Sequence, residues 1–528
     1  MSSTISCVEV ADLLAGDLPF ALIDVREAGE YNASHIVGAS LIPRRELELR
    51  IADSVPFVDT TVVLCDDDGR RAALAAETLR VLGYRNALAM SGGMNRWVTE
   101  RRPTEWGVNV PSKDFGEKVQ VQHGVPEIDA VELRRRMDRG DKMVILDTRT
   151  PEEYQRNCIP GGRSVPNGEL GLHISDIIDE MDEEDTTVVI NCAGRTRSII
   201  GTRLLQRMGV ENVVGLENGT AGWVLAGYEL ESGADRLDLP DPTDEGLVAA
   251  EEFADRLVEQ DGVRYIDMAE LDSLRARSES ESVYLIDVRT ESEYVEAHIP
   301  GFRWFPGGQA VQRADEVAVV HNAPIVFCCD GRARAAFTAS WYRQMGFEEV
   351  YAVRGGTTAW GESGRALESG VSVSGVRALS EKSVSTVTAD DVDAASDTAR
   401  IIHVGLSTEF AQGHVPGASW APRGWLEFRI GDVAPDKDTQ IIVTCADGGV
   451  QSLLAAATLT DLGYTNVSAL DGGTRAWQNS GRDVEVGLTG VMSPPNDMVP
   501  TGPDRGFADM VNYLRWEEEL GHKYAIDV

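Results

Sequence analysis

Lysine and cysteine are scarce in this sequence, and long apolar runs are absent from it. Six of the 528 residues are lysine, and 86 acidic residues outnumber 49 basic ones, which gives a formal net charge of −37. Such an acidic protein repels phosphate backbones and anionic lipids, so we expect no nucleic acid and no membrane among its partners. No run of about 18 apolar residues occurs, so no membrane-spanning helix is predicted.

The seven cysteines do not follow the pattern of a disulfide-bonded or zinc-binding protein. Their number is odd, their spacing is wide and no CxxC pair occurs. We therefore expect no disulfide framework and no structural zinc. The first residues also lack a basic segment followed by an apolar core, which favours a cytoplasmic protein with reduced thiols.

What the chain does contain is one module repeated four times. Each copy opens with a helix-capping pair, in which a side chain that bears an oxygen precedes an acidic residue by three positions. These pairs are Ser6/Glu9, Asp129/Glu132, Asp267/Glu270 and Thr388/Asp391.

Three further motifs follow in the same order in every copy. A strand motif reads LIDVREAGEY (22–31), ILDTRTPEEY (145–154), LIDVRTESEY (285–294) and IIHVGLSTEF (401–410). A turn motif reads HIVGASLIP (35–43), CIPGGRSVP (158–166), HIPGFRWFP (298–306) and HVPGASWAP (414–422). A cysteine loop reads VVLCDDDGRRA (62–72), VVINCAGRTRS (188–198), IVFCCDGRARA (325–335) and IIVTCADGGVQS (441–452). Apolar strands that alternate with helical stretches predict a parallel α/β sheet, with the site at the carboxyl ends of its strands.

These motifs resemble those of the rhodanese homology domain, and the resemblance covers most of the chain. It implies an α/β fold of four tandem domains, each a small central parallel sheet flanked by helices, followed by a C-terminal helical tail. The expected ranges are 1–110, 120–235, 263–372 and 380–490 for domains 1 to 4, with an acidic linker and helix at 236–262 and a linker and helix at 491–528.

The lengths of the linkers suggest how the domains associate. Residues 98–122 and 361–385 are short connections, whereas the acidic stretch from 231 to 262 is longer. This favours two pairs, domains 1 and 2 and domains 3 and 4, with a hinge between the pairs. In the tail, Phe507, Met510 and Leu514 follow helical spacing, and we expect this helix to dock on a domain by packing rather than to serve as an active-site lid.

The loop of domain 2 meets the requirements of a reactive thiolate best. Cys192 ends an apolar strand, and a helix-like run follows it, so backbone N–H groups and a helix N-terminus converge on the sulfur. We predict Cys192 as the principal nucleophile; the alternative is a buried cysteine at a strand end beside exposed arginines. The residues predicted to bind the substrate anion are Gly194, Arg195, Thr196, Arg197 and Ser198.

Domain 3 offers a second loop of this type. Cys329 aligns with Cys192, and Gly331, Arg332 and Arg334 are predicted to bind its substrate. Cys328 is then a core residue, although the spacing from Cys328 to Arg334 also fits the longer loop of phosphatases of this fold.

The other two loops are weaker candidates for catalysis. In domain 1, Cys65 precedes three aspartates, which would raise the pKa of the thiol and repel a dianion. Its spacing to Arg71 also fits a phosphatase. In domain 4, no arginine follows Cys445, and the usual acid and arginine of the strand motif are replaced by His403 and Gly405.

Two further positions are interpreted as structural. The acid and arginine that end the other strand motifs, such as Asp147 and Arg149, are expected to form a buried salt bridge that holds the neighbouring loop. Cys158 replaces the histidine of the turn motif in domain 2, and we favour a simple replacement over a resolving thiol for Cys192.

The resemblance implies a thiosulfate sulfurtransferase that needs no metal or organic cofactor. Its partners would be a small anionic sulfur donor and a thiol or cyanide acceptor, and a homodimer is left open. Two alternatives remain: a phosphatase or arsenate reductase of the same fold, and a sulfur carrier or scaffold without catalytic activity.

Overall fold

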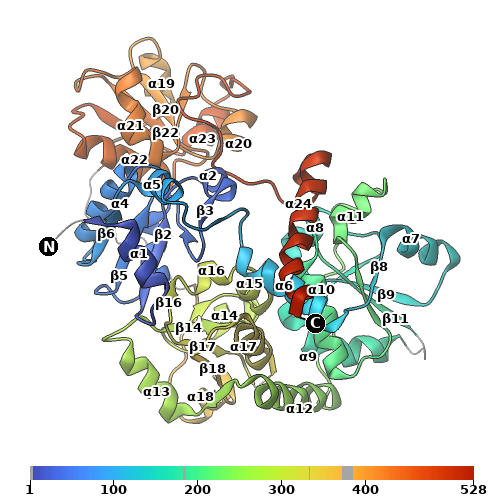
Figure 1. Ribbon diagram of the computed structural model, residues 1–528. Coiled ribbons are helices and arrows are strands. Elements are labelled where there is room, and N and C mark those ends of the chain that lie inside the picture. Colours follow the sequence, from blue (N-terminus) through green and yellow to red (C-terminus); the bar gives the residue numbers. More distant parts are fainter. Residues whose placement is uncertain (1–3, 182–185, 332, 372–383, 528) are drawn as a thin grey trace. The chain divides into compact units, whose positions relative to one another are not determined.

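The computed structural model describes residues 4–181, 186–331, 333–371 and 384–527 (Figure 1). In each of the four domains, five strands of that domain pair in parallel in the order first, fifth, fourth, second, third. The predicted fold class, four tandem α/β domains with a C-terminal helix, is confirmed.

The strands are short and lie side by side, from one edge of each sheet to the other, in the following order. Domain 1 has β1 (Thr4–Ile5), β6 (Ala87–Met90), β5 (Thr61–Cys65), β2 (Phe20–Asp24) and β4 (Ser40–Leu41), with β3 (His35–Ile36) and β7 (Thr104–Glu105) as a separate antiparallel pair. Domain 2 has β8 (Glu127–Ile128), β12 (Val213–Leu216), β11 (Thr187–Asn191), β9 (Met143–Asp147) and β10 (Arg163–Ser164). Domain 3 has β13 (Arg264–Ile266), β18 (Val350–Val353), β17 (Ile325–Cys328), β14 (Tyr284–Asp287) and β15 (Arg303–Trp304), and also contains β16 (Val320–His321). Domain 4 has β19 (Thr386–Val387), β23 (Val467–Leu470), β22 (Ile441–Thr444), β20 (Arg400–His403) and β21 (Ser419–Trp420).

The helices connect these strands. Domain 1 has α1 (Cys7–Leu14), α2 (Ala28–Ala33), α3 (Leu47–Ser54), α4 (Arg70–Val81) and α5 (Gly93–Thr99). Domain 2 has α6 (Val110–His123), α7 (Ala130–Arg139), α8 (Pro151–Arg156), α9 (Asn167–Glu180), α10 (Thr196–Met208) and α11 (Gly219–Leu225). After α12 (Asp244–Asp261), domain 3 has α13 (Met268–Arg277), α14 (Glu291–Glu296), α15 (Gly307–Gln312), α16 (Ala314–Val317), α17 (Ala333–Met345) and α18 (Gly356–Glu362). Domain 4 has α19 (Ala389–Ala395), α20 (Ser407–Gln412), α21 (Arg423–Val433), α22 (Val450–Asp461) and α23 (Gly473–Asn479), and the tail has η2 (Gly502–Asp504), α24 (Phe507–Gly521) and η3 (His522–Asp527).

The strand before each cysteine loop is buried on both faces, as its continuous apolar sequence requires. In β11, Val188 and Ile190 belong to one apolar cluster and Val189 to another. The first cluster includes Leu170 of α9, and the second includes Trp223 of α11. Helices therefore cover both faces of the sheet, and the loop after β11 emerges at its edge.

The predicted caps and salt bridges are present. Ser6, Asp267 and Thr388 form complete capping boxes, and Asp129 accepts a hydrogen bond from the backbone N–H of Glu132. The buried ion pairs at the ends of the strand motifs are Asp24–Arg26 at 2.7 Å, Asp147–Arg149 at 2.8 Å and Asp287–Arg289 at 2.7 Å. Each arginine also donates to a backbone carbonyl eight residues further along, which fixes the turn that follows.

The predicted pairing of the domains is wrong. The chain forms one compact unit from residues 1–108 and 373–499, and a second from residues 109–372 and 500–528. Domain 1 thus associates with domain 4, and domain 2 with domain 3 and the tail. Linker length is a poor guide because the entropy of closing a loop grows only slowly with its length.

Both units pair their domains through the segment that follows the turn motif. In the first unit, Arg423 donates to the Glu48 Oε1 atom at 2.7 Å, and Arg44 lies 3.1 Å from Glu427. In the second unit, the start of α9 contacts the start of α15, where Gly168 lies against Gly307 and Gly308. The association is therefore specified by contacts at one equivalent surface of every domain.

The helix of the acidic linker, α12, is an internal element rather than a hinge. It packs against α9 of domain 2 and α17 of domain 3. Phe253 and Leu257 are buried, and the ring of Phe253 lies 5.6 Å from that of Phe337. This helix joins domains 2 and 3 instead of separating two pairs.

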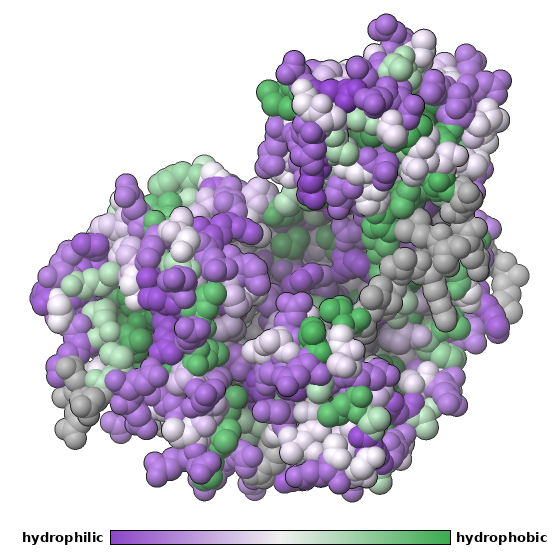
Figure 2. Space-filling view, turned by 180° about the vertical axis from the view of Figure 1, so that it is seen from behind, coloured by the Kyte–Doolittle hydropathy of each residue, from purple (hydrophilic) through white to green (hydrophobic). Residues whose placement is uncertain are grey.

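The tail docks on a domain, as predicted, and the structure shows that this is domain 2. Met510 and Leu514 of α24 are buried in a cluster with Ala221 of α11, and α24 also packs along α6 (Figure 1). Among the described residues, no helix has the length and apolarity needed to cross a membrane. The face seen in Figure 2 carries mainly hydrophilic residues with small separate apolar patches, in keeping with the net charge of −37.

Candidate active sites at the cysteine loops

The sheet registers show which loop residues are equivalent. In domain 2, Asn191 lies opposite Asp147 at the ends of their strands, and Cys192 is the next residue. The corresponding pairs are Asp24–Cys65, Asp287–Cys328 and His403–Thr444. The first residue of the loop is therefore Asp66, Cys192, Cys329 and Cys445 in domains 1 to 4.

A backbone hydrogen bond supports this alignment in all four domains. The carbonyl of the first loop residue accepts an N–H from the helix that follows the last strand. The donors, in chain order, are Met94 at 2.7 Å, Thr220 at 2.9 Å, Thr357 at 2.8 Å and Thr474 at 2.9 Å. The predicted equivalence of Cys329 and Cys192 is confirmed.

The alignment assumed for domain 1 is wrong. Cys65 lies inside β5, is fully buried and belongs to the apolar core of its domain. Burial and the nearby Asp24 raise the pKa of its thiol well above the ordinary value. Counted from Asp66 to Arg71, the loop has the same length as that from Cys192 to Arg197. The spacing from Cys65 to Arg71 therefore does not measure the loop and no longer suggests a phosphatase.

The turn behind Cys192 requires glycine. Gly219 adopts φ 53°, and a Cβ atom there would lie 2.1 Å from the Cys192 carbonyl oxygen. A side chain is therefore excluded on steric as well as conformational grounds. The close approach allows the Thr220 N–H to hold the Cys192 carbonyl, which fixes the backbone that carries the thiol.

The sulfur of Cys192 faces the start of α10. Its Sγ atom lies 3.6 Å from Ser198 Oγ, which itself donates to the Arg195 carbonyl at 2.7 Å. The helix begins at Thr196, four residues after the cysteine, and Cys192 is 2% exposed. The predicted sequence of strand, loop and helix N-terminus is present around this thiol.

The two arginines of this loop have different surroundings. Arg197 makes a two-pronged ion pair with Glu153 at 2.7 and 2.9 Å, and it is buried. Burial alone would lower the pKa of Arg197, but Glu153 and the neighbouring Cys192 raise it above its ordinary value. Arg197 therefore stays charged in this buried position near Cys192.

Arg195 pairs with a different set of acids. Its Nε and Nη2 atoms donate to the Glu117 carboxylate on α6 at 2.6 and 3.1 Å, and Glu127 and Glu518 lie within 3.8 Å. Its charge is largely offset by these acids, so it fastens the loop to α6.

The tail helix lies against the same loop. A Cβ atom on Gly194 would be 3.2 Å from Glu517 Oε2 and 3.9 Å from Leu514. Tyr513 donates to Glu517 Oε1 at 2.7 Å, and burial, Glu517 and Cys192 together raise the pKa of the Tyr513 hydroxyl. The helical spacing of the tail was visible in the sequence, but its contact with the Cys192 loop was not.

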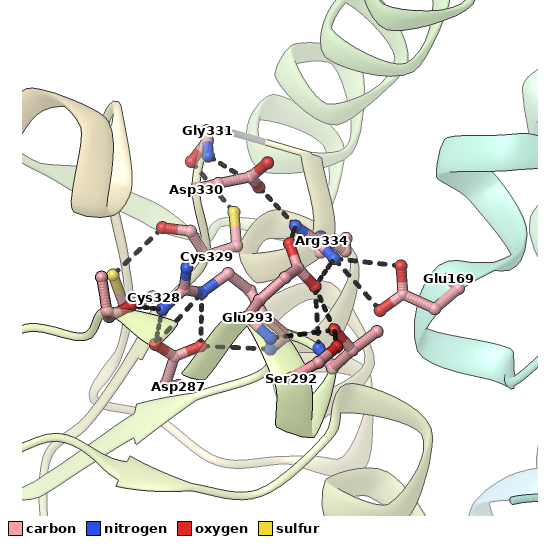
Figure 3. A network of polar contacts seen from close by, with 12 residues as sticks. Glu169, Asp287, Ser292, Glu293, Cys328, Cys329, Asp330, Gly331 and Arg334 are labelled. Carbon is pink, nitrogen blue, oxygen red and sulfur yellow. Dashed lines mark hydrogen bonds and ion pairs between the residues drawn. The ribbon is translucent and has the colours of Figure 1, made fainter. Parts of the chain in front are cut away.

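Cys329 of domain 3 has a less favourable environment for ionisation (Figure 3). It is fully buried, and its Sγ donates to the Gly331 carbonyl at 3.0 Å. Burial and the Asp330 charge raise the pKa of this thiol to about 12, although Arg334 acts in the opposite sense. Cys328 points elsewhere and packs in the core, and Arg332 lies outside the described residues.

Asp66 of domain 1 occupies the place of the cysteine and is held by the loop itself. Its carboxylate accepts hydrogen bonds from the backbone N–H groups of Gly69, Arg71 at 2.6 Å and Ala72 at 3.3 Å. Arg71 is tied to Glu30 at 2.7 Å and Asp67 at 2.6 Å. An internal carboxylate therefore fills the anion cradle of this loop.

Domain 4 has a cysteine at the equivalent position, but the arginines and the buried aspartate of domain 2 are absent from its loop and strand motif. Cys445 is 4% exposed, and burial raises the pKa of its thiol. Its helix begins five residues after the cysteine, one more than in domain 2. His403 replaces the buried aspartate, and neither of its ring nitrogens has a hydrogen-bond partner among the described residues.

Comparison with known proteins agrees with this repeated architecture. The family model of the rhodanese-like domain matches residues 6–100, 129–226, 270–363 and 388–480. The chain belongs to the rhodanese-like domain family. Each matched segment lies inside one of the four expected domain ranges.

Proteins similar to this rhodanese-like chain include sulfurtransferases. A crystal structure of thiosulfate sulfurtransferase from Pseudomonas aeruginosa has a TM-score of 0.88 and 33% identity, and the alignment covers 99% of this chain and 98% of that one. Thiosulfate sulfurtransferase of Azotobacter vinelandii is 24% identical over 255 residues, which are 41% of this chain and 93% of the relative.

Some curated relatives share one domain only. The Bacillus subtilis (strain 168) protein named "Putative sulfur carrier protein YrkF" is 30% identical over 99 residues, which are 19% of this chain. The match spans about half, 51%, of that relative.

We expect Asp66 to stabilise its rhodanese-like domain. Asp66→Ala removes the acceptor of three backbone N–H groups, so the free energy of unfolding should fall by about 1–3 kcal/mol. Hydrogen exchange at the first turn of α4 during denaturant titration measures this local loss. Asp68→Ala is the control, because Asp68 is exposed, and should change stability by less than about 0.5 kcal/mol. Equal effects from the two variants would contradict the cradle.

Proposed function

We propose that the protein transfers a sulfane sulfur from thiosulfate to a thiophilic acceptor through a persulfide on Cys192. The observation that carries the proposal is the position of this thiol at the start of α10, with the charge of Arg197 beside it. The similarity to a thiosulfate sulfurtransferase over nearly the whole chain supports the choice of donor.

In the first half of the reaction, the Cys192 thiolate attacks the outer sulfur of thiosulfate. A bond forms between the two sulfurs, and the bond between the outer sulfur and the sulfonate sulfur breaks. Sulfite leaves with the electron pair, and a negatively charged persulfide remains on Cys192. N–H groups at the start of α10 and the charge of Arg197 stabilise this anion.

In the second half, the acceptor attacks the terminal sulfur of the persulfide. Cyanide takes that sulfur as thiocyanate, or a thiolate takes it as a new persulfide, and the Cys192 thiolate returns as the leaving group. The two half-reactions give ping-pong kinetics, and no redox partner is needed because sulfite and the acceptor balance the electrons.

The other cysteine loops have less support as sites of sulfur transfer. Cys329 would run the same cycle, but its raised pKa leaves little thiolate at neutral pH. The phosphatase alternative loses its basis because Cys65 and Cys328 lie within strands rather than in loops.

Mass spectrometry of the protein treated with thiosulfate tests the proposal. We expect Cys192 to gain the mass of one sulfur atom, and cyanide to remove it. The core cysteines Cys65 and Cys328 serve as internal controls that gain nothing. A protein with no added sulfur on any cysteine would instead support a scaffold.

A further inference from the structure

The loops of domains 2 and 3 differ in the acids that surround the equivalent arginine. Arg334 meets the carboxylates of Glu293 at 2.6 Å, Asp330 at 2.6 Å and Glu169 at 3.0 Å (Figure 3). Arg197 meets Glu153 at 2.7 Å, and no further carboxylate of the described residues lies within ion-pair distance of it. The arginine of the Cys329 loop therefore meets two more carboxylates than the equivalent arginine of the Cys192 loop.

One of the three acids at Arg334 comes from the neighbouring domain. Glu169 lies in the first turn of α9, three residues after Pro166, and its side chain crosses into domain 3. Figure 3 shows it approaching Arg334 from the side opposite Asp330. Glu169 is 4% exposed, so solvent screens its charge weakly.

The equivalent residue of domain 3 is neutral. Gln309 lies three residues after Pro306 in the first turn of α15, and its side chain crosses into domain 2. Its Nε2 atom donates to Glu153 Oε2 at 3.4 Å, on the acid that pairs with Arg197. Each domain thus sends one side chain toward the arginine of its neighbour, a carboxylate in one direction and an amide in the other.

Glycines at the crossing make this exchange possible. A Cβ atom on Gly168 would lie 3.0 Å from the backbone nitrogen of Gly308 and 3.1 Å from that of Gly307. The two helix starts are therefore in backbone contact, and the next side chain on each reaches the other domain. Glu169 and Gln309 both line a cavity of about 380 Å³ at this crossing.

We propose that this pair of positions decides which of the two thiols an anionic sulfur donor can load. The carboxylate of Glu169 closes the Cys329 site to dianions such as thiosulfate, whereas the amide of Gln309 leaves the Cys192 site open to them. Cys329 is thereby reserved for donors or modifying reagents without negative charge. The choice of donor rests on the proposed function, but the charge selectivity of the two thiols does not.

Alkylation by two reagents of similar size tests the charge selectivity directly. Iodoacetate is an anion and iodoacetamide is neutral. The rate of alkylation by iodoacetate divided by the rate by iodoacetamide at one cysteine therefore reports the local charge, and a higher ratio means less negative charge. We expect Glu169→Gln to raise this ratio about fivefold at Cys329 and to leave it within twofold at Cys192. The reciprocal change Gln309→Glu should lower the ratio at Cys192 by a similar factor. Peptide mass spectrometry of the full-length folded protein gives both ratios.

A matched control separates the effect of the charge at position 169 from the effect of a change in the net charge of the protein. Glu291 lines the same cavity but is exposed, so Glu291→Gln removes the same charge and should change neither ratio by more than about 1.5-fold. Circular dichroism checks that each variant is folded. An unchanged ratio at Cys329 in Glu169→Gln would overturn the proposal, as would no labelling of Cys329 in any variant, because burial and not charge would then protect the thiol.

Thiosulfate loading then separates this inference from the proposed function. If Glu169→Gln raises both the alkylation ratio and persulfide formation at Cys329, the two stand together. If the ratio rises while no cysteine takes sulfur from thiosulfate, the charge selectivity stands and the proposed donor falls.

Discussion

Replacing Cys192 by serine is expected to lower the turnover of thiosulfate and cyanide by about 100-fold or more. A serine hydroxyl does not ionise near neutral pH, so the first nucleophilic attack is lost at the principal site. The remaining turnover would depend on Cys329. A thiol with a pKa of about 12 is ionised in about one molecule in 10⁴ at pH 8, so this residual rate should be small.

Cys329→Ser is the matched control for that experiment. It removes the equivalent thiol of the neighbouring domain and should retain thiosulfate turnover within about twofold of the unaltered protein. Turnover is followed as thiocyanate formed from cyanide. If Cys192→Ser keeps more than half of the activity, or if Cys329→Ser loses most of it, domain 2 is not the principal site.

Much of the fold could be predicted because its signals are local and repeated. The capping pairs, the strand motif and the turn motif each depend on a few neighbouring residues. The place of Cys192 between a strand and a helix start could also be predicted, since strand, loop and helix start are contiguous in sequence.

The place of Asp66 could not be read from the sequence in the same way. Domain 1 has a cysteine next to the loop, and only the strand register shows that this cysteine ends β5. In a strand, a shift of one residue moves a side chain to the opposite face of the sheet. Cys65 therefore points into the core, and Asp66 takes the position that Cys192 has in domain 2.

Contacts between segments that are distant in the sequence also could not be predicted. The sequence predicted one helix within 236–262 and another within 491–528, but their partners depend on which apolar faces meet after the domains have folded. Phe253 meets Phe337 and Leu514 approaches Gly194, and neither pairing leaves a signal in the spacing of residues. The same holds for Glu169 and Gln309, whose partners lie in another domain.

The second large effect is expected at Arg197. Arg197→Met removes the positive charge that acts on the Cys192 thiolate and on the departing sulfite, and thiosulfate turnover should fall by about 30-fold or more. Alkylation of Cys192 should also require a higher pH, because the thiolate loses a stabilising charge. Arg195→Met is the comparison, since Arg195 is paired with Glu117 and should affect the alkylation profile much less.

The single variant would also lose stability, because Glu153 would be left partly buried without its partner. A double variant, Arg197→Met with Glu153→Gln, separates the two effects. It removes both charges, so thermal stability should recover toward that of the unaltered protein while turnover stays low. Recovery of turnover together with stability would show that Arg197 matters for folding alone.

The acid stability of the double variant gives an independent check. Burial would raise the pKa of Glu153, but Arg197 overcomes this effect and lowers it from 4.5 to about 2. A carboxylate whose pKa is lowered by folding stabilises the folded protein when the pH is above the pKa of that group in the unfolded chain. This stabilisation is lost as the pH falls from 4.5 toward 2. Because the Glu153 side chain is 31% exposed, screening by water limits it to about 2 kcal/mol. Between pH 4.5 and 2 the double variant should therefore lose less stability than the unaltered protein, which identifies the ion pair rather than the size of the side chains as the source of the difference.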